Sequence, residues 1–208
     1  MTFEQKCQLL IVGDAAVGKS SILRRFAQNT FNQEYLSTLG IDYFTKDIKI
    51  NNKVIHVKIW DTAGEERYRS LTQSFLKNGE GILIVFALNN KTSFDSLKFW
   101  MDSIQNILDS QEREIPSIIL GNKLDLENGR EVDKEEAKEF AKNKNCQYFE
   151  VSAKTGEGID ESIKYLIQRV VEVIDKNKKE NKKENIKIKK AEEKNEKLKN
   201  LKDCCNKD

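Results

Sequence analysis

The sequence predicts an α/β domain: a doubly wound, mostly parallel six-stranded sheet with one antiparallel edge strand and flanking helices. Four short apolar runs are typical of buried strands, and segments with apolar residues at helical spacing separate them. The strand-like runs lie at residues 9–12, 82–87, 118–120 and 148–151. Strands that alternate with helices in this way form a parallel sheet through βαβ crossovers.

The remaining two strands come from a hairpin signal between the first and second runs. Residues 44–50 and 54–60 flank Asn51-Asn52, a short polar pair suited to a tight turn, so these strands should pair antiparallel at one edge. The clearest helical spacings lie further along the chain. One set is Phe94, Leu97, Met101, Ile104 and Leu108, and the other is Ile159, Ile163, Leu166, Val170 and Ile174.

The first strand leads directly into V-G-D-A-A-V-G-K-S, residues 12–20, and a helical pattern with Ile22 and Leu23 follows. Strand, glycine-bearing loop and helix in this order match the P-loop pattern G-x-x-x-x-G-K-S. A glycine turn that fits by accident is the alternative, and this context disfavours it. Gly13 and Gly18 leave room for backbone N–H groups to surround a phosphate chain. We therefore infer that the chain binds a nucleotide through its phosphates.

Two side chains of this loop carry specific chemistry. Lys19 supplies a full positive charge to the outer phosphates. Ser20 supplies a hydroxyl oxygen, which suits the Mg²⁺ that accompanies a nucleoside triphosphate. The predicted phosphate-binding residues are Ala16, Val17, Gly18, Lys19, Ser20 and Ser21.

Two further stretches are compatible with the same chemistry. In D-T-A-G, after a predicted strand, Asp61 can hold magnesium through water and Gly64 can bring its N–H to a terminal phosphate oxygen. Taken alone, this motif is also typical of an ordinary turn. The loop of residues 31–43 contains Thr38, which by itself predicts only a solvated or capping threonine.

The base could be selected at the ends of the last two predicted strands. In N-K-L-D, residues 122–125, the Asp125 carboxylate can accept from the N1–H and the amino group of guanine, a donor pair that adenine lacks. A backbone N–H of S-A-K, residues 152–154, can reach the guanine oxygen. The predicted base-binding residues are Asn122, Lys123, Asp125, Ser152, Ala153 and Lys154.

The 208 residues allow one domain with a sizeable core plus an appendage. The net charge of +2 is unevenly spread: residues 176–208 hold 13 lysines against 7 acidic residues, a net +6, which leaves −4 for residues 1–175. An acidic body with a basic tail argues against a nucleic-acid-binding domain and for a tail that meets an anionic surface.

No apolar run is long enough to span a membrane and no signal peptide is evident, so we expect a protein made and kept in the cytosol. The four cysteines agree with a reducing compartment. Cys7 and Cys146 fall in predicted strands and are interpreted as buried free thiols, whereas Cys204 and Cys205 stand together near the end. None has metal-ligand spacing.

Taken together, G-D-A-A-V-G-K-S, Thr38, D-T-A-G-E, N-K-L-D and S-A-K resemble the Ras superfamily of small GTPases over residues 6–175. No motif after the first is decisive alone, but their order and spacing are specific. The resemblance implies a P-loop small G domain over residues 1–175, with Mg²⁺ as cofactor and GTP or GDP as the bound nucleotide.

The resemblance also assigns roles to single residues. Thr38 matches the threonine that completes the magnesium shell only while the γ-phosphate is present, and Gly64 matches the glycine that contacts the same phosphate. Phe31 matches the aromatic residue packed on the base, and Tyr35 the tyrosine that closes over the phosphates. The implied magnesium ligands are Ser20, Thr38 and Asp61. Losing the γ-phosphate would release both loops and change which partners bind.

Within the superfamily, S-T-L-G-I-D-Y, V-K-I-W-D-T-A-G and E-R-Y-R-S-L-T resemble the Rab family. Tyr43, Trp60 and Phe75 match its aromatic triad on the effector face, although core packing also explains such residues. The resemblance implies a switch in vesicular membrane traffic that binds effectors in its GTP form. It also implies an exchange factor, a GTPase-activating protein and a GDP-dissociation inhibitor. We expect a monomer on the cytosolic face of an intracellular membrane, cycling through the cytosol.

The implied catalytic residues are Lys19 and Glu65, and slow intrinsic GTP hydrolysis is expected. Glu65 replaces the glutamine that orients the attacking water in the family. A carboxylate can accept a hydrogen bond from that water but cannot donate one to it, and its negative charge faces an anionic γ-phosphate. The sequence does not decide whether Glu65 slows hydrolysis or positions the water better. A hydrolysis-poor, mostly GTP-bound membrane scaffold is the alternative function. N-K-L-D disfavours an ATP-dependent P-loop kinase.

Residues 176–208 form a basic tail of Lys, Asn and Glu without glycine or proline. We expect it to prolong the last helix briefly and then to be disordered, serving as a solvated spacer or as a membrane-attracted stretch. The ending Cys204-Cys205-Asn206-Lys207-Asp208 resembles the C-C-x-x-x ending of Rabs, on which both cysteines carry geranylgeranyl chains. Two such chains make membrane attachment durable.

Overall fold

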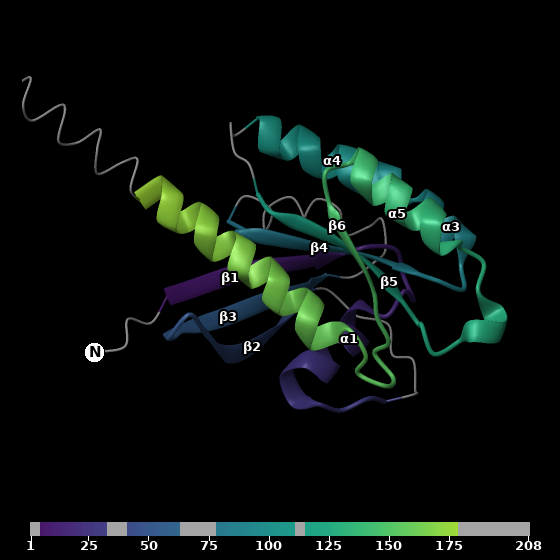
Figure 1. Cartoon of the computed structure of the whole chain (residues 1–208), viewed down its shortest axis with the longest axis horizontal. Coiled ribbons are helices and arrows are strands. Elements are labelled where there is room, and N and C mark those ends of the chain that lie inside the picture. The colour runs from purple at the N-terminus through teal and green to yellow at the C-terminus, as the bar shows by residue number, and fades with distance from the viewer. Residues whose placement is uncertain (1–4, 33–40, 63–77, 111–114, 179–208) are drawn as a thin grey trace, which may run out of the picture. The chain divides into compact units, whose positions relative to one another are not determined.

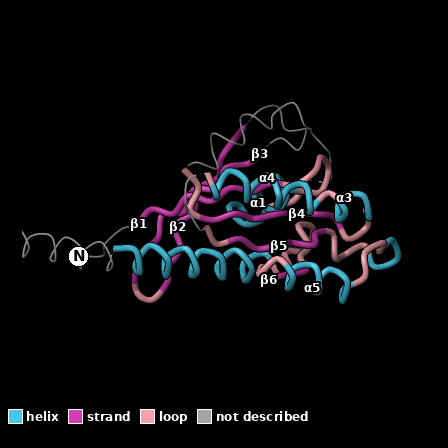
Figure 2. The backbone as a smooth tube through the Cα atoms, turned by 90° about the horizontal axis from the view of Figure 1, so that it is seen from above, coloured by secondary structure: helices cyan, strands magenta, loops and turns pink. Residues whose placement is uncertain are grey.

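The structure of the chain is a computed structural model that describes residues 5–32, 41–62, 78–110 and 115–178. Its six strands form one sheet in the order β2-β3-β1-β4-β5-β6 (Figures 1 and 2). The strands are β1 Gln5–Val12, β2 Ile41–Ile50, β3 Lys53–Thr62, β4 Gly81–Ala87, β5 Ser117–Asn122 and β6 Gln147–Glu150. Among the strands in these ranges, only β2 and β3 pair antiparallel. The predicted fold class, including its antiparallel edge strand, is confirmed.

Helices cover the two faces of this sheet. They are α1 Lys19–Gln28, α3 Lys91–Asp95, α4 Leu97–Asp109, α5 Lys134–Asn143, the short 3₁₀ turn η2 Glu127–Gly129 and a helix over residues 159–178. In Figure 1, α3, α4 and α5 lie on one face and α1 lies on the other. No helix in the described ranges is long and apolar enough to cross a membrane.

The chain divides into two compact units, residues 1–170 and 171–208. Helical structure in the second unit extends to residue 178, where the described part of the chain ends. The boundary that the sequence predicts between globular domain and tail, at residues 175 and 176, stays a prediction.

The central strands are buried on both faces, which explains why their sequences are continuously apolar. Every residue of β4 is buried. Leu10 and Val12 of β1 belong to the core cluster that includes apolar residues of α4 and α5. The neighbouring residue Leu9 faces the other way, since its side chain lies beside Gly81 together with Leu166 and Val170 of the helix over residues 159–178.

The edge hairpin forms around the predicted turn. Asn51 and Asn52 both adopt left-handed backbone conformations, with φ of 48° and 62°, as a two-residue type I′ turn requires. Asparagine tolerates this region better than other side chains that carry a Cβ atom, which explains why it replaces the usual glycine here. The paired strands are longer than predicted, since Ile41 pairs with Thr62.

Two local predictions were wrong. The helix expected to run through Phe94 and Leu108 is divided at Ser96 into α3 and α4, and within it Trp100 is buried whereas Met101 is only partly buried. Cys146 lies one residue before β6 and is partly buried, so it is not in a strand. Cys7 lies in β1 and is buried, as predicted.

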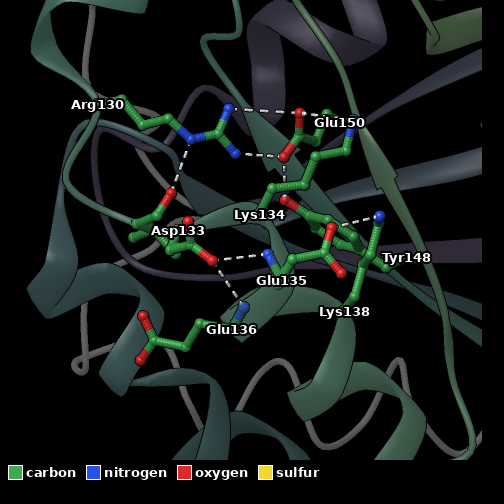
Figure 3. Close-up of polar contacts among 9 residues, drawn as sticks. Arg130, Asp133, Lys134, Glu135, Glu136, Lys138, Tyr148 and Glu150 are labelled. Carbon is green, nitrogen blue, oxygen red and sulfur yellow. Dashed lines mark hydrogen bonds and ion pairs between the residues drawn. The ribbon is translucent and has the colours of Figure 1, made fainter.

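A polar network fixes the end of β6 to the chain that follows β5 (Figure 3). Glu150, whose side chain is 9% exposed, pairs with the guanidinium of Arg130. The Tyr148 hydroxyl donates to the same carboxylate at 3.0 Å, and the Lys134 ammonium lies 3.8 Å away. The carboxylate therefore has partners on three sides, although it is largely removed from water.

Burial alone would raise the pKa of Glu150. Hydrogen bonds from Arg130 and Tyr148 outweigh that effect and hold the pKa below the usual value for glutamate. Because the folded state lowers the pKa, this carboxylate stabilises the fold above the pKa of an unfolded glutamate. The contribution is lost as the pH falls through the folded-state pKa.

We expect Glu150→Gln to lower the free energy of unfolding at pH 7 by about 2 kcal/mol, because Arg130 loses its ionic partner in a largely buried site. Urea denaturation measures the change. The difference from the wild type should shrink as the pH falls through the lowered pKa of Glu150, because the carboxylate itself then becomes protonated. The control is Glu135→Gln, which removes an exposed ion pair with Lys138 and should cost less than about 0.5 kcal/mol. Equal losses for both variants would contradict this account.

Candidate functional site

The loop between β1 and α1 makes its turns with two glycines in crowded positions. Gly13 has a φ of +142°, and a Cβ atom there would lie 2.1 Å from the Val85 carbonyl oxygen. Gly18 caps α1 in the left-handed region, and a Cβ atom there would lie 2.3 Å from Asn122 Nδ2. Neither position can hold a larger residue without displacing its neighbours.

The rest of the loop leads into the start of α1. Ala16 is exposed and adopts a left-handed conformation with a φ of 60°, which is uncommon for alanine. Val17 is buried and directs its carbonyl oxygen to Asn122. Ser20 and Ser21 lie in the first turn of α1. Successive N–H groups in such a turn, together with a helix N-terminus, form a concave site for an anion.

Lys19 is buried with its charge directed back over the loop. Its ammonium donates to the carbonyl oxygens of Gly13 at 2.9 Å and Asp14 at 2.8 Å. Burial lowers the pKa of Lys19 to about 8, and the nearby carboxylates of Asp61 and Asp14 only partly oppose this. An anionic ligand beside the ammonium would favour its charged form.

Asp61, near the end of β3, brings a carboxylate to the same place. It is 2% exposed, and within the described part of the chain its Oδ1 atom has no hydrogen-bond partner. Burial raises the pKa of Asp61, while a hydrogen bond from Ser20 and the charge of Lys19 partly counteract it. A buried carboxylate oxygen without a partner, next to a serine hydroxyl, fits a hard divalent cation such as Mg²⁺.

The described residues contain no cluster of three or more His, Cys, Asp or Glu side chains that could hold a metal ion. Mg²⁺ does not require such a cluster, because it keeps several waters and binds one or two protein groups together with substrate phosphates. Ser20 and Asp61 therefore fit a magnesium ion that arrives with a phosphate ligand.

Asn122, the last residue of β5, connects this loop to the other half of the site. Its Nδ2 atom donates to the Val17 carbonyl at 2.8 Å, and its Oδ1 atom accepts the Ala153 N–H at 3.1 Å. The side chain is almost fully buried. The Ala153 N–H is thus engaged with Asn122 in this structure, and the predicted contact of an S-A-K backbone N–H with a guanine oxygen stays a prediction.

Asp125 is held in place from two sides. Ser152 Oγ donates to its Oδ1 atom at 2.6 Å, and the Lys154 ammonium lies 3.9 Å from its Oδ2 atom. Lys123 has a φ of 70°, and burial lowers its pKa although the Asp125 charge opposes this. A carboxylate fixed in this way presents acceptor oxygens in a defined direction.

The structure therefore brings together the predicted residues of the two halves of the site. Phe31 lies after α1 with 36% of its surface exposed. Several predicted residues lie outside the described ranges: Tyr35, Thr38, Gly64, Glu65, Phe75, Cys204 and Cys205.

Tyr43 and Trp60 face each other across β2 and β3, with ring centroids 5.3 Å apart in an edge-to-face arrangement. The Lys58 ammonium lies 3.8 Å from the Tyr43 centroid and 3.7 Å from the Trp60 centroid. Because Tyr43 is 51% exposed, the core-packing interpretation does not hold for it. The pair forms an aromatic and cationic feature of the sheet surface.

Sequence reasoning missed two residues that support the site. Trp100 of α4 donates its indole N–H to Asp14 Oδ1 at 2.8 Å, which ties the phosphate-binding loop to a helix far along the chain. Arg25 of α1 donates to the carbonyl oxygens of Ala153 and Lys154. Neither residue belongs to a motif, and an arginine on the polar side of a helix is usually interpreted as a solvated charge.

The sequence is similar to proteins of the Ras family over most of its length. The model of the Ras family matches residues 8–172. The chain is 39% identical over 156 residues to the Ras-related protein Rab-1 of Theileria parva, an alignment that covers 74% of this chain and 70% of that protein. It is 37% identical over 161 residues to the human Ras-related protein Rab-8B, covering 77% and 76%.

A third relative extends the match further. The Ras-related protein Rab-13 of Bos taurus is 34% identical over 169 residues, which cover 81% of this chain and 82% of that protein. Residues 8–172, which the family model matches, include most of the sheet, the phosphate-binding loop and the residues at the ends of β5 and β6. The chain belongs to the Ras superfamily of small GTPases and, within it, to the Rab family.

Proposed function

We propose that this chain is a molecular switch of vesicular membrane traffic that binds GTP and GDP, hydrolyses GTP slowly and recruits effectors in its GTP form. The observation that carries this proposal is the Asn122 side chain, which bonds to Val17 of the phosphate-binding loop and to Ala153 beside Asp125. A ligand with a polyphosphate at one end and a guanine base at the other would span this arrangement. Family membership supports the same ligand.

The phosphate end would be held by the backbone N–H groups of residues 16–21 and by the Lys19 ammonium. Ser20 and Asp61 would hold Mg²⁺, with Thr38 as the further ligand that the family implies. When bound, Mg²⁺ neutralises charge on the β- and γ-phosphates. Lys19 would leave the Gly13 and Asp14 carbonyls for the phosphates and stabilise the charge that develops on them.

Asp125 would recognise the base, because its carboxylate can accept two hydrogen bonds from guanine. Asn122, Lys123 and Lys154 would surround the ring. Phe31 would pack on the base and Tyr35 would cover the phosphates. Thr38 and Gly64 would respond to the γ-phosphate, so that effectors distinguish GTP from GDP at the surface that includes Tyr43, Trp60 and Phe75.

Asp125→Asn tests the assignment of the base. The substitution replaces an acceptor oxygen with an amide donor, which suits xanthine, whose C2 position carries an oxygen instead of an amino group. We expect GDP binding to weaken by about a hundredfold or more and binding of xanthosine diphosphate to strengthen. Equilibrium titration with fluorescent analogues measures both affinities. The control is Asp102→Asn, an exposed aspartate of α4 near Lys144, which should leave both affinities unchanged.

An unchanged preference for GDP in Asp125→Asn would contradict the assignment of Asp125. A wild-type chain that binds ATP as tightly as GTP would favour the ATP-dependent kinase interpretation instead.

Glu65 is expected to make intrinsic hydrolysis slower than glutamine would at the same position. Its negative charge opposes the γ-phosphate, and it cannot donate a hydrogen bond in orienting water. We expect Glu65→Gln to raise the single-turnover rate of GTP hydrolysis by about tenfold. The matched control is Glu66→Gln, which removes the same charge one residue away. Equal rates for the native chain and Glu65→Gln would dispose of the idea, and the hydrolysis-poor scaffold would lose its only support.

The tail would attach the switch to membranes through geranylgeranyl chains on Cys204 and Cys205, aided by its lysines at an anionic surface. Mass spectrometry of the protein from its own cells should show both cysteines modified. The double variant Cys204→Ser and Cys205→Ser should move to the soluble fraction, whereas Cys146→Ser should not, because Cys146 is partly buried in the folded domain. Unmodified thiols in the native protein would refute the anchor.

A further inference from the structure

Arg25 makes an unusually complete set of contacts for an arginine at a helix surface. It lies on α1, six residues after Lys19. Its Nε atom donates to the Ala153 carbonyl at 3.0 Å and its Nη2 atom to the Lys154 carbonyl at 2.6 Å. Its Nη1 atom donates to the backbone oxygen of Asn29 at 3.0 Å and to Asn29 Oδ1 at 3.1 Å. All three guanidinium nitrogens are therefore used.

The partners of Arg25 belong to the base-binding half of the site. Ala153 also donates its N–H to Asn122, and the Lys154 ammonium lies near Asp125. The loop of residues 152–154 is thus held on one side by the end of β5 and on the other by α1. Because α1 begins with Lys19 and Ser20, one rigid helix connects the phosphate-binding residues with the loop beside the base.

Asn29 fixes the direction of the Arg25 side chain. It ends α1 in the left-handed region, with a φ of 54°, and its N–H donates to the Arg25 carbonyl at 2.9 Å. The Asn29 side chain then accepts from the Arg25 guanidinium. The two residues brace each other, so the planar guanidinium is pre-organised toward two neighbouring carbonyls, a geometry that a lysine ammonium cannot reproduce.

We propose that Arg25 is a positioning residue that ties α1 to the loop of residues 152–154 and thereby sets how long a guanine nucleotide stays bound. This inference rests on the proposed function. Arg25 acts through the two carbonyl groups and does not touch the nucleotide. Without it, the loop would separate from α1 more often, and each opening would expose the base side of the site to release.

The dissociation rate of a fluorescent GDP analogue from the full chain, chased with excess GDP in the presence of Mg²⁺, tests the proposal. We expect Arg25→Ala to speed dissociation by about tenfold, since two charge-assisted hydrogen bonds to the loop are lost. Arg25→Lys should give an intermediate rate, because one ammonium reaches only one of the two carbonyls at a time.

Lys46→Ala is the matched control for a purely structural effect. Lys46 of β2 donates to the Phe26 carbonyl at 2.6 Å, in the same last turn of α1, and lies 3.7 Å from Asp160. It supports the helix end without contacting residues 152–154. We expect it to lower the melting temperature as Arg25→Ala does but to change the GDP dissociation rate by less than about twofold.

Hydrogen exchange of the GDP-bound chains supplies a second readout. The amides of residues 153–156 should exchange faster in Arg25→Ala and Arg25→Lys than in Lys46→Ala. If Arg25→Ala fails to fold, the comparison of Arg25→Lys with Lys46→Ala decides the question. A dissociation rate in the Arg25 variants equal to that of the wild type or of Lys46→Ala would overturn the proposal. If the wild-type chain does not bind the GDP analogue, the proposed function fails first.

Discussion

The rest of the site depends on the Asn122 side chain. It joins two loops that lie more than a hundred residues apart in the sequence. Its amide bonds to Val17 on one side and to Ala153 on the other. The contact is possible only because Gly18 has no side chain, as a Cβ atom there would lie 2.3 Å from Asn122 Nδ2. The parallel strands β1, β4, β5 and β6 bring the loops after β1 and β6 to the carboxyl ends of the strands, where such sheets bind their ligands.

Two charged groups of the site, Lys19 and Asp61, are buried without full compensation from neighbouring residues in the described ranges. Lys19 is buried against neutral carbonyls with a lowered pKa, and Asp61 is buried with a raised pKa and one oxygen without a partner within the described ranges. Burying both groups costs free energy that their mutual attraction offsets only in part. A polyphosphate beside Lys19 and a divalent cation beside Asp61 would satisfy both groups.

The fold was largely predictable, because four apolar runs, two helical spacings and the Asn51-Asn52 turn each constrain local structure. The break at Ser96 was not, since α3 and α4 follow each other so closely that their apolar spacing looks continuous. The residues proposed to hold the phosphates and the base were predicted from the chemistry of their motifs. Arg25 and Trp100 were missed because their partners, the Ala153 and Lys154 carbonyls and Asp14, become neighbours only in the folded chain. Every residue has a backbone carbonyl, so the sequence does not show which carbonyl accepts a hydrogen bond from a side chain.

The central claim is that one connected site holds a polyphosphate and a guanine base together. The most direct test is to denature the purified full-length chain, identify the released nucleotide by chromatography, and repeat this after prolonged incubation with a magnesium chelator. The account predicts that a single guanine nucleotide per chain is retained in the presence of Mg²⁺ and is lost when Mg²⁺ is removed. A chain that carries no nucleotide and takes up none, or that holds adenine nucleotide equally well, would contradict it.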